Sequence, residues 1–339
     1  MIIAAVILVT VIALIILRPR GLDVAWPAGV GAVLVVLVGL LSFAQLGQLF
    51  GDVWDAAATL IALFLLSEAL DRNGFFNWAA LVLARCARGS GWRLYGLVLL
   101  LTTGVTALLA NDGAVLMLTP IYARLMLRIY PKDKGLAFLF AAGFFADALS
   151  GIFIPSNLTN IIIADANHLS FLTVAKWMAL PSLAAFIAGG AAFAWRFRRT
   201  IAHPYDASAL DEPATAIHNR VVFWWGWGAL AFLIVGYSVG GQLHLPVSLI
   251  AGCAALIMVL VVRAYGLGDV RALVAHAPWS ILIYALGMFV VINAAYDAGV
   301  LGFVTHPWQH AVASGAGTGG TLAAGGLAAL LAAAVNNLP

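Results

Sequence analysis

The chain has 339 residues, of which 64% are hydrophobic and only 9% are charged, with a formal net charge of +3. Soluble domains carry charge on about a quarter of their residues, so this composition excludes a soluble globular protein. The basic residues lie in short segments between apolar stretches, and this placement does not indicate a nucleic-acid partner. Two isolated cysteines, Cys86 and Cys253, argue against a disulfide framework and a cysteine-based metal site.

Several apolar stretches have about the length that a bilayer crossing requires, which predicts an all-α polytopic membrane protein. The N-terminal stretch lacks a basic region and a cleavage site, so it is expected to be a first span rather than a cleaved signal. Residues 75–87 are shorter and end in basic residues, which predicts an interfacial helix. The predicted spans are 2–17, 24–41, 55–70, 136–153 with a continuation to 164, 171–194, 221–239, 246–262 and 279–296.

A first polar break, Ala110-Asn111-Asp112-Gly113, interrupts the apolar segment 95–128. Non-helical backbone at membrane depth is tolerated only where it is buried in protein or lines a cavity. An ionisable Asp112 is expensive in a bilayer, and such residues are usually functional. We therefore predict that 95–128 is a re-entrant hairpin that enters and leaves on one side. The alternative is a kinked span with an Asn-Asp cap.

A second break, Pro155-Ser156-Asn157-Leu158-Thr159-Asn160, divides the apolar run 136–164 into a broken helix. Pro155 removes a helical hydrogen bond. Ser156, Asn157, Thr159 and Asn160 then supply uncharged donors and acceptors, which are groups that a transporter uses to bind its substrate. The alternative is a helix N-cap that follows a kink.

Asp147 lies two helical turns before the second break. Together with Asp112 it is the candidate for proton coupling, because a carboxylate removed from water can hold a proton near neutral pH. The alternative for both residues is a structural, hydrogen-bonded carboxyl group.

The basic residues predict an orientation. With the N-terminus outside and the hairpin 95–128 returning to its own side, sixteen of the seventeen Lys and Arg residues face the cytoplasm, and only Lys176 does not. This is a strong positive-inside signal. Residues 201–220 are then a cytoplasmic linker.

A forward repeat also runs through the chain. Trp54 recurs as Trp279, Gly74 as Gly299, and Asn111-Asp112 as Asn336-Asn337, each 225 residues later. Secondary transporters are often built from such repeats, and the predicted orientation makes the two copies inverted. We expect a first repeat at 1–200 and a second at 221–339 that is incomplete, with roughly 80 residues of the second copy absent. Asn336 and Asn337 are the predicted tip of a second hairpin.

At these residues the chain resembles the ArsB family of arsenite and antimonite efflux permeases. The resemblance covers the whole chain. It is carried by residues 71–80 (DRNGFFNWAA), 110–114 with 118–120, 156–160 (SNLTN), 277–279 (APW) and 336–339 (NNLP).

The resemblance implies a secondary transporter that exports trivalent arsenic or antimony, as the neutral trihydroxide, across the bacterial inner membrane. It implies exchange against protons by alternating access, no cofactor, and docking of a separate arsenite-stimulated ATPase. By matching position, the substrate site would contain Asn111, Asp112, Gly113, Ser156, Asn157, Thr159, Asn160, Asn336 and Asn337.

Three alternatives stay open at this stage. A carboxylate or sodium/proton transporter of the same superfamily would use the same scaffold. An intramembrane enzyme is disfavoured, because the chain lacks a paired-Asp signature, a His-Glu-x-x-His helix and a Ser-His pair at membrane depth. A fragment that only oligomerises in the lipid membrane would need no substrate site.

Overall fold

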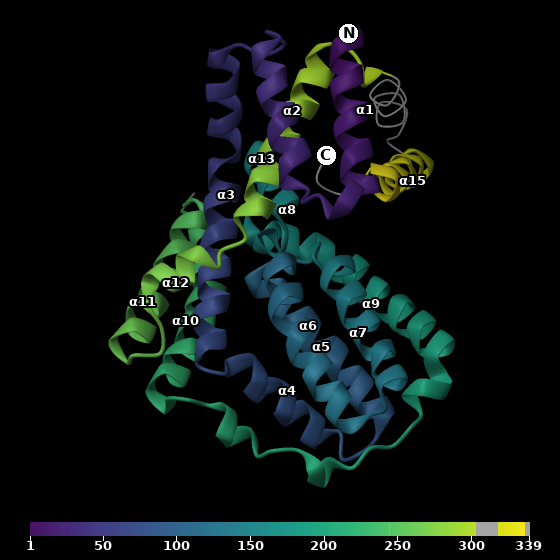
Figure 1. Ribbon diagram of the computed structural model, residues 1–339, viewed down its shortest axis with the longest axis vertical. Helices are drawn as coiled ribbons and strands as arrows, with labels where there is room; N and C mark the ends of the chain where they lie inside the picture. Colours follow the sequence, from purple (N-terminus) through teal and green to yellow (C-terminus); the bar gives the residue numbers. More distant parts are fainter. Residues whose placement is uncertain (244, 303–317, 336–339) are drawn as a thin grey trace. The chain divides into compact units, whose positions relative to one another are not determined.

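The computed structural model describes residues 1–243, 245–302 and 318–335, and most of these residues are helical, with no strand among them (Figure 1). Six of the helices in this part of the chain are long and apolar enough to cross a membrane, and three shorter helices are also apolar. The prediction of an all-α polytopic membrane protein is therefore confirmed. The chain forms two compact units: residues 1–57 together with the described residues from 278 onward, and residues 58–277.

The first unit is built around a close contact between α2 and α13. Its helices are α1 (Ile2–Leu17), α2 (Ala25–Leu37), the first part of α3 (Phe43–Arg72), α13 (Trp279–Asp297) and α15 (Thr318–Val335). A Cβ on Gly287 would lie 2.7 Å from the backbone of Ala28, so only glycine allows this approach. Small residues at helix crossings are a common way to pack helices in membranes, where burial of apolar surface gives little driving force.

The second unit contains the remaining helices. They are the last part of α3, α4 (Phe75–Cys86), α5 (Gly91–Leu109), α6 (Asn111–Ile129), α7 (Lys132–Ala148), α8 (Leu158–Ala166), α9 (Phe171–Ile201), α10 (Arg220–Gly240), α11 (Val247–Ala264) and α12 (Val270–Ala275). Helices α5, α6 and α7 pack against one another, α9 packs on α7, and α10 packs on α11. The core of this unit therefore lies around the α5–α6 pair.

Most predicted spans coincide with helices to within a few residues, but three differ. Helix α9 continues to Ile201 instead of ending at residue 194. Helix α3 begins at Phe43 rather than near residue 55, so Asp55 lies inside the helix and is buried instead of marking its boundary. The run 136–164 is broken earlier than Pro155. Helix α7 ends at Ala148, and a turn followed by the short 3-10 helix η2 (Ile154–Ser156) separates it from α8. The side chains in this turn explain the early end, as described below.

Candidate functional site

The first break is a single strained residue. Ala110 has φ 65° and ψ 151°, a conformation that residues with a Cβ rarely adopt, and it separates α5 from α6. Such backbone costs on the order of 1–3 kcal/mol and persists only where the surrounding packing fixes it. Ala110 is buried, and α5 packs on α6 on either side of it. The two helices therefore form a hairpin whose tip carries Asn111, Asp112 and Gly113.

Asn111 ties this tip to the end of α7. Its Nδ2 donates to Oδ1 of Asp147 over 3.3 Å, and its Oδ1 accepts from the backbone N–H of Asp112 at 2.9 Å. Asp112 is half-buried, and its carboxylate is close enough to that of Asp147 for the two charges to repel. The structure thus brings together three of the predicted site residues, one of which is 35 residues or more from the others.

Gly113 faces α3. A Cβ on Gly113 would lie 3.4 Å from Oγ of Ser67, which is buried and donates its own hydrogen bond to the carbonyl of Leu63 at 2.8 Å. Sequence reasoning missed Ser67. In the sequence, Ser67 stands out only as a hydroxyl between the apolar residues Leu63–Leu66 and Ala69–Leu70. A serine in such a place more often only donates to a carbonyl of its own helix, as Ser67 also does.

At the second break, Ser156 is fully buried and serves the turn itself. Its Oγ accepts from the N–H of Phe153 at 3.2 Å and lies within hydrogen-bond distance of the carbonyls of Phe153 and Ser150. A buried hydroxyl engaged in this way has little capacity left for a ligand. Ser156 therefore acts as a brace of the turn in this conformation.

Asn157 and Asn160 complete the same network. Asn157 Nδ2 donates to Ser150 Oγ at 3.0 Å, and its Oδ1 caps α8 by accepting from the N–H and Oγ of Thr159 at 3.1 and 3.0 Å. Asn160 Nδ2 donates to the carbonyls of Ser150 and Phe153 at 2.7 and 3.0 Å. Half-buried Thr159 and Asn160 are the members of this set that reach the surface of the unit.

Ser150 joins the two breaks. Its side chain and carbonyl hold Ser156, Asn157 and Asn160, and its backbone N–H donates to the carbonyl of Asp147 at 3.0 Å. Through Asp147, this turn is connected to Asn111 at the hairpin tip. Helix η2 also packs against α5. Sequence reasoning did not single out Ser150, because a serine in the Leu149-Ser150-Gly151 turn has no distinguishing neighbour.

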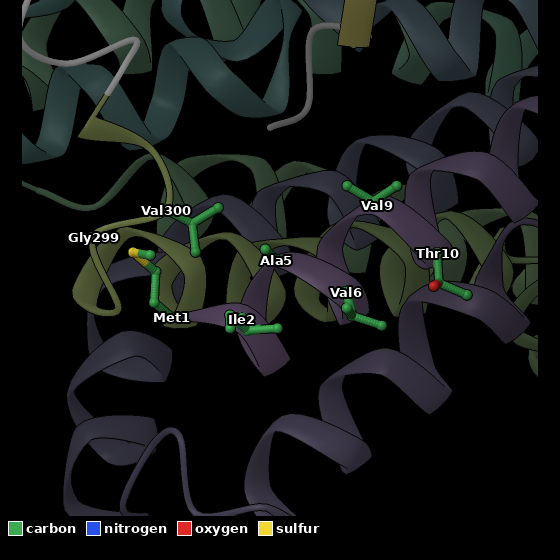
Figure 2. Close-up of a pocket in the computed structure, with 8 residues that line it drawn as sticks. All are labelled: Met1, Ile2, Ala5, Val6, Val9, Thr10, Gly299 and Val300. Carbon is green, nitrogen blue, oxygen red and sulfur yellow. The ribbon is translucent and has the colours of Figure 1, made fainter.

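Asn336 and Asn337 lie outside the described residues. No group of three or more His, Cys, Asp or Glu side chains in the described ranges could hold a metal ion. A cavity of about 480 Å³ lies in the first unit instead (Figure 2), and its lining by Met1, Ile2, Ala5, Val6, Val9, Thr10, Gly299 and Val300 is almost wholly apolar. Among the side chains that line it, only that of Thr10 carries a hydrogen-bonding group.

Comparison of the sequence with known proteins identifies the family of this chain. The family model for the arsenical pump membrane protein, ArsB, matches residues 3–339. The chain belongs to the ArsB family. It is accordingly a multi-pass transmembrane transport protein from a family of arsenical pumps rather than an enzyme by itself.

Three relatives illustrate the range of similarity within and around ArsB. The arsenical pump membrane protein of Escherichia coli is 38% identical over 341 residues, which cover all of this chain and 79% of the relative. The protein of the same name from Yersinia enterocolitica is 37% identical with the same coverage. A putative arsenical pump membrane protein of Bacillus subtilis (strain 168) is 28% identical over 95% of this chain and 76% of its own length.

Proposed function

We propose that this chain exports trivalent arsenic or antimony, as the neutral trihydroxide, in exchange for protons. The family membership supports the metalloid substrate, since the relatives carry the name of arsenical pumps. The observation that carries the site assignment is the hydrogen bond between Asn111 at the hairpin tip and Asp147 at the end of α7. It joins two separate breaks in one polar cluster.

The proposed substrate contacts are Asn111, Asp112 and the backbone at Gly113, with Thr159 and Asn160 beside the second break. A neutral trihydroxide both donates and accepts hydrogen bonds, and amide, hydroxyl and carboxyl groups do the same. Asp112 makes no ion pair within the described residues, so it has no basic partner there that would favour an anion. Asn336 and Asn337 are proposed as the matching contacts from the second repeat.

Asp112 and Asp147 are the proposed proton carriers. Two neighbouring carboxylates repel each other, and taking up a proton relieves that repulsion. Asn111 touches one of these carboxylates and is adjacent to the other, so a substrate that displaces its amide would also change their environment. We propose that this link couples substrate release to protonation.

The transport cycle proposed here is alternating access by two inverted repeats in the inner membrane, with the N-terminus outside. The repeated sequence features and the distribution of basic residues support this layout. Docking of an arsenite-stimulated ATPase would add a second energy source, and the expected surroundings of the helices are membrane lipid.

Uptake of arsenite into everted membrane vesicles energised by a proton gradient tests the proposal. Accumulation that an uncoupler collapses would support proton-coupled metalloid export. Absence of accumulation by protein that is folded in the membrane would refute it. In that event, citrate-driven sodium uptake by the same vesicles would indicate the carboxylate or sodium/proton transporter of the wider superfamily.

A further inference from the structure

The segment between α9 and α10 is docked against the second unit along its length. Figure 1 shows it running past α4 as it crosses from α9 to α10. It contains two short 3-10 helices, η3 (Ala207–Ala209) and η4 (Pro213–Ala216). Buried residues recur along it at Ile201, Tyr205, Leu210 and Ala216, with mostly exposed residues between them. A free linker would have no reason to bury residues at intervals, so this pattern indicates a bound segment.

The first anchor holds the open end of the α5–α6 hairpin. A Cβ on Gly91, at the start of α5, would lie 2.1 Å from the carbonyl oxygen of Ile201. Tyr130, directly after α6, donates its hydroxyl to the carbonyl of His203 at 3.0 Å. The N–H of Tyr205 donates to the carbonyl of Gly89 at 3.0 Å. The segment therefore bridges the two helix ends that lie farthest along the chain from the Ala110 tip.

The second anchor holds the C-terminal end of α4. The hydroxyl of Tyr205 donates to the carbonyl of Ala84, and Arg85 donates to the carbonyl of Leu210 at 2.8 Å. Burial raises the pKa of Tyr205 to about 12, so the hydroxyl keeps its proton and remains a donor at neutral pH.

An ion pair between the segment and α6 lies between these anchors along the chain. Arg128, in the last turn of α6, binds both carboxylate oxygens of Asp211. The hydrogen bond from Arg128 lowers the pKa of Asp211, so the pair is charged at neutral pH. Both side chains are about half-exposed, and ion pairs of this kind contribute little to stability. The pair therefore helps to orient the segment on α6 but contributes little to the free energy of its docking.

The third anchor holds the start of α4. Asn73 and Asn219 exchange two hydrogen bonds: Asn73 Nδ2 donates to the Asn219 carbonyl at 3.0 Å, and the Asn219 N–H donates to Asn73 Oδ1 at 2.8 Å. Gly74 has φ 77°, and a Cβ there would lie 1.9 Å from the carbonyl oxygen of Ala216. The side chain of Asn219 also caps α10. One asparagine thus ends the segment and begins the next helix.

We propose that residues 201–219 form a clasp that positions the hairpin for transport. The clasp fastens α4, the start of α5 and the end of α6 to one another. Phe75 and Trp78 of α4 also pack on Phe223 and Trp227 of α10, with ring centroids 4.8–6.1 Å apart, which continues the attachment beyond the clasp. In this assignment Asn73, Gly74, Gly89 and Gly91 are positioning residues, because they act on the substrate site only through the helices.

The clasp can act on the hairpin tip because α5 and α6 are rigid helices. Each helix has 19 residues, and the two are covalently joined only at the strained Ala110. A shift of one helix along the other at the open end is transmitted to the tip, where the Asn111 to Asp147 bond is already long at 3.3 Å. The clasp opposes that shift. This inference rests on the proposed function only in assigning the tip to substrate binding.

Two glycine substitutions test the clasp, each with a matched control. Gly91→Ala places a methyl group against the Ile201 carbonyl, whereas Gly96→Ala in the same helix meets nothing within 4 Å. Gly74→Ala collides with Ala216, whereas Gly39→Ala imposes the same left-handed strain, at φ 75°, with open space around it. Asn73→Ala removes two hydrogen bonds without any collision and serves where Gly74→Ala does not fold.

Two readouts are needed. In lipid nanodiscs, which leave both faces open, the rate at which protease cuts the exposed bonds near Ser208 reports undocking whatever the substrate is. In vesicles, the initial rate of arsenite uptake reports transport. Clasp variants should be cut about tenfold faster and transport about tenfold more slowly than their controls. Arg128→Asp and Asp211→Arg should each increase the rate of cutting by a smaller factor. Combining the two changes re-forms the ion pair with its charges exchanged and should return the rate of cutting to that of the unaltered chain.

The two readouts separate the failures. A clasp variant that is cut faster but transports normally overturns the clasp, and so does one that transports poorly while its segment stays protected. Absence of arsenite uptake in the unaltered chain refutes the proposed substrate. In that case the protease series still tests the docking, with uptake of the substrate then identified as its second readout.

Discussion

The two breaks contain similar polar residues but use them differently. At the first break, Asn111 reaches out of its own hairpin to Asp147 on α7, and Asp112 stays half-buried. At the second break, Ser156, Asn157 and Asn160 direct their donors back to Ser150 and Phe153 of the same turn. Polar residues at a helix break are therefore not all binding groups. Some replace the hydrogen bonds that the broken helix gives up.

The comparison predicts the largest effect at the carboxylates of the first break. Asp147→Asn keeps an oxygen that can accept from Asn111 but cannot take up a proton, and Asp112→Asn likewise removes a proton carrier. We expect either change to lower proton-driven arsenite uptake by about a hundredfold, a typical loss when a proton-transfer group is removed. Initial rates in everted vesicles measure this.

Asp52→Asn is the control, because Asp52 is exposed on α3 outside the cluster. Unchanged uptake in both Asp112→Asn and Asp147→Asn would refute the proposal that these two carboxylates couple transport to protons.

Removal of the link between the breaks should have the next largest effect. Asn111→Ala deletes the hydrogen bond to the Asp147 carboxylate, and bonds to charged groups contribute about 1.5–3 kcal/mol. We expect uptake at low arsenite concentration to fall by at least about tenfold, as that energy implies. Asn167→Ala is a matched control, since exposed Asn167 only caps the end of α8 by donating to Ile163. Equal behaviour of the two variants would contradict the assignment of Asn111.

The second break should respond in stability rather than in transport. Ser156→Ala removes the acceptor of the half-buried Phe153 N–H, while the Ser150 and Phe153 carbonyls keep the donor Asn160. A polar group left without its partner in this way costs about 1–3 kcal/mol. We expect the temperature at which half of the purified protein has unfolded to be lower. The KM for arsenite of the protein that remains folded should change by less than about twofold. A rise in KM without loss of stability would instead make Ser156 a substrate contact and remove the contrast between the breaks.

The smallest effect is expected at Gly113. Its missing Cβ would lie 3.4 Å from Ser67 Oγ, which is ordinary contact, so Gly113→Ala should change uptake by less than about twofold. Gly113→Val adds methyl groups that must displace Ser67 or the tip, and it should reduce uptake clearly. Unchanged uptake by Gly113→Val would show that the contact with Ser67 of α3 does not constrain the hairpin tip.

Much of the fold followed from local sequence. Apolar length predicted the membrane-spanning helices, and the short amphipathic stretch ending in Arg85 predicted α4, because both signals depend only on neighbouring residues. The first break was also found, since Asn111-Asp112-Gly113 stands out in an apolar segment. The resemblance to ArsB, carried by short motifs, is confirmed by the family match. The two inverted repeats, the domain limits and the orientation stay predictions.

Other features were not accessible in this way. The early end of α7 depends on Ser150, whose role appears only when Ser156, Asn157 and Asn160 converge on it. The extension of α3 back to Phe43 runs through Gln45, Gly47, Gln48, Gly51 and Asp52, which are poor signals for a membrane helix. The linker 201–220 reads as an ordinary polar loop, yet it is anchored by glycines whose carbonyl contacts lie more than 100 residues away.

The sequence alone determined that this is a helical membrane protein of the ArsB family and that its backbone breaks at two polar points. These properties depend on composition and on short motifs, which act locally. Only the tertiary structure decided which polar groups of the breaks point outward and which brace their own turn, and that residues 201–219 are bound. The partners of these hydrogen bonds and close backbone contacts are residues that are distant along the chain. Local sequence does not indicate which distant residues come together in the fold.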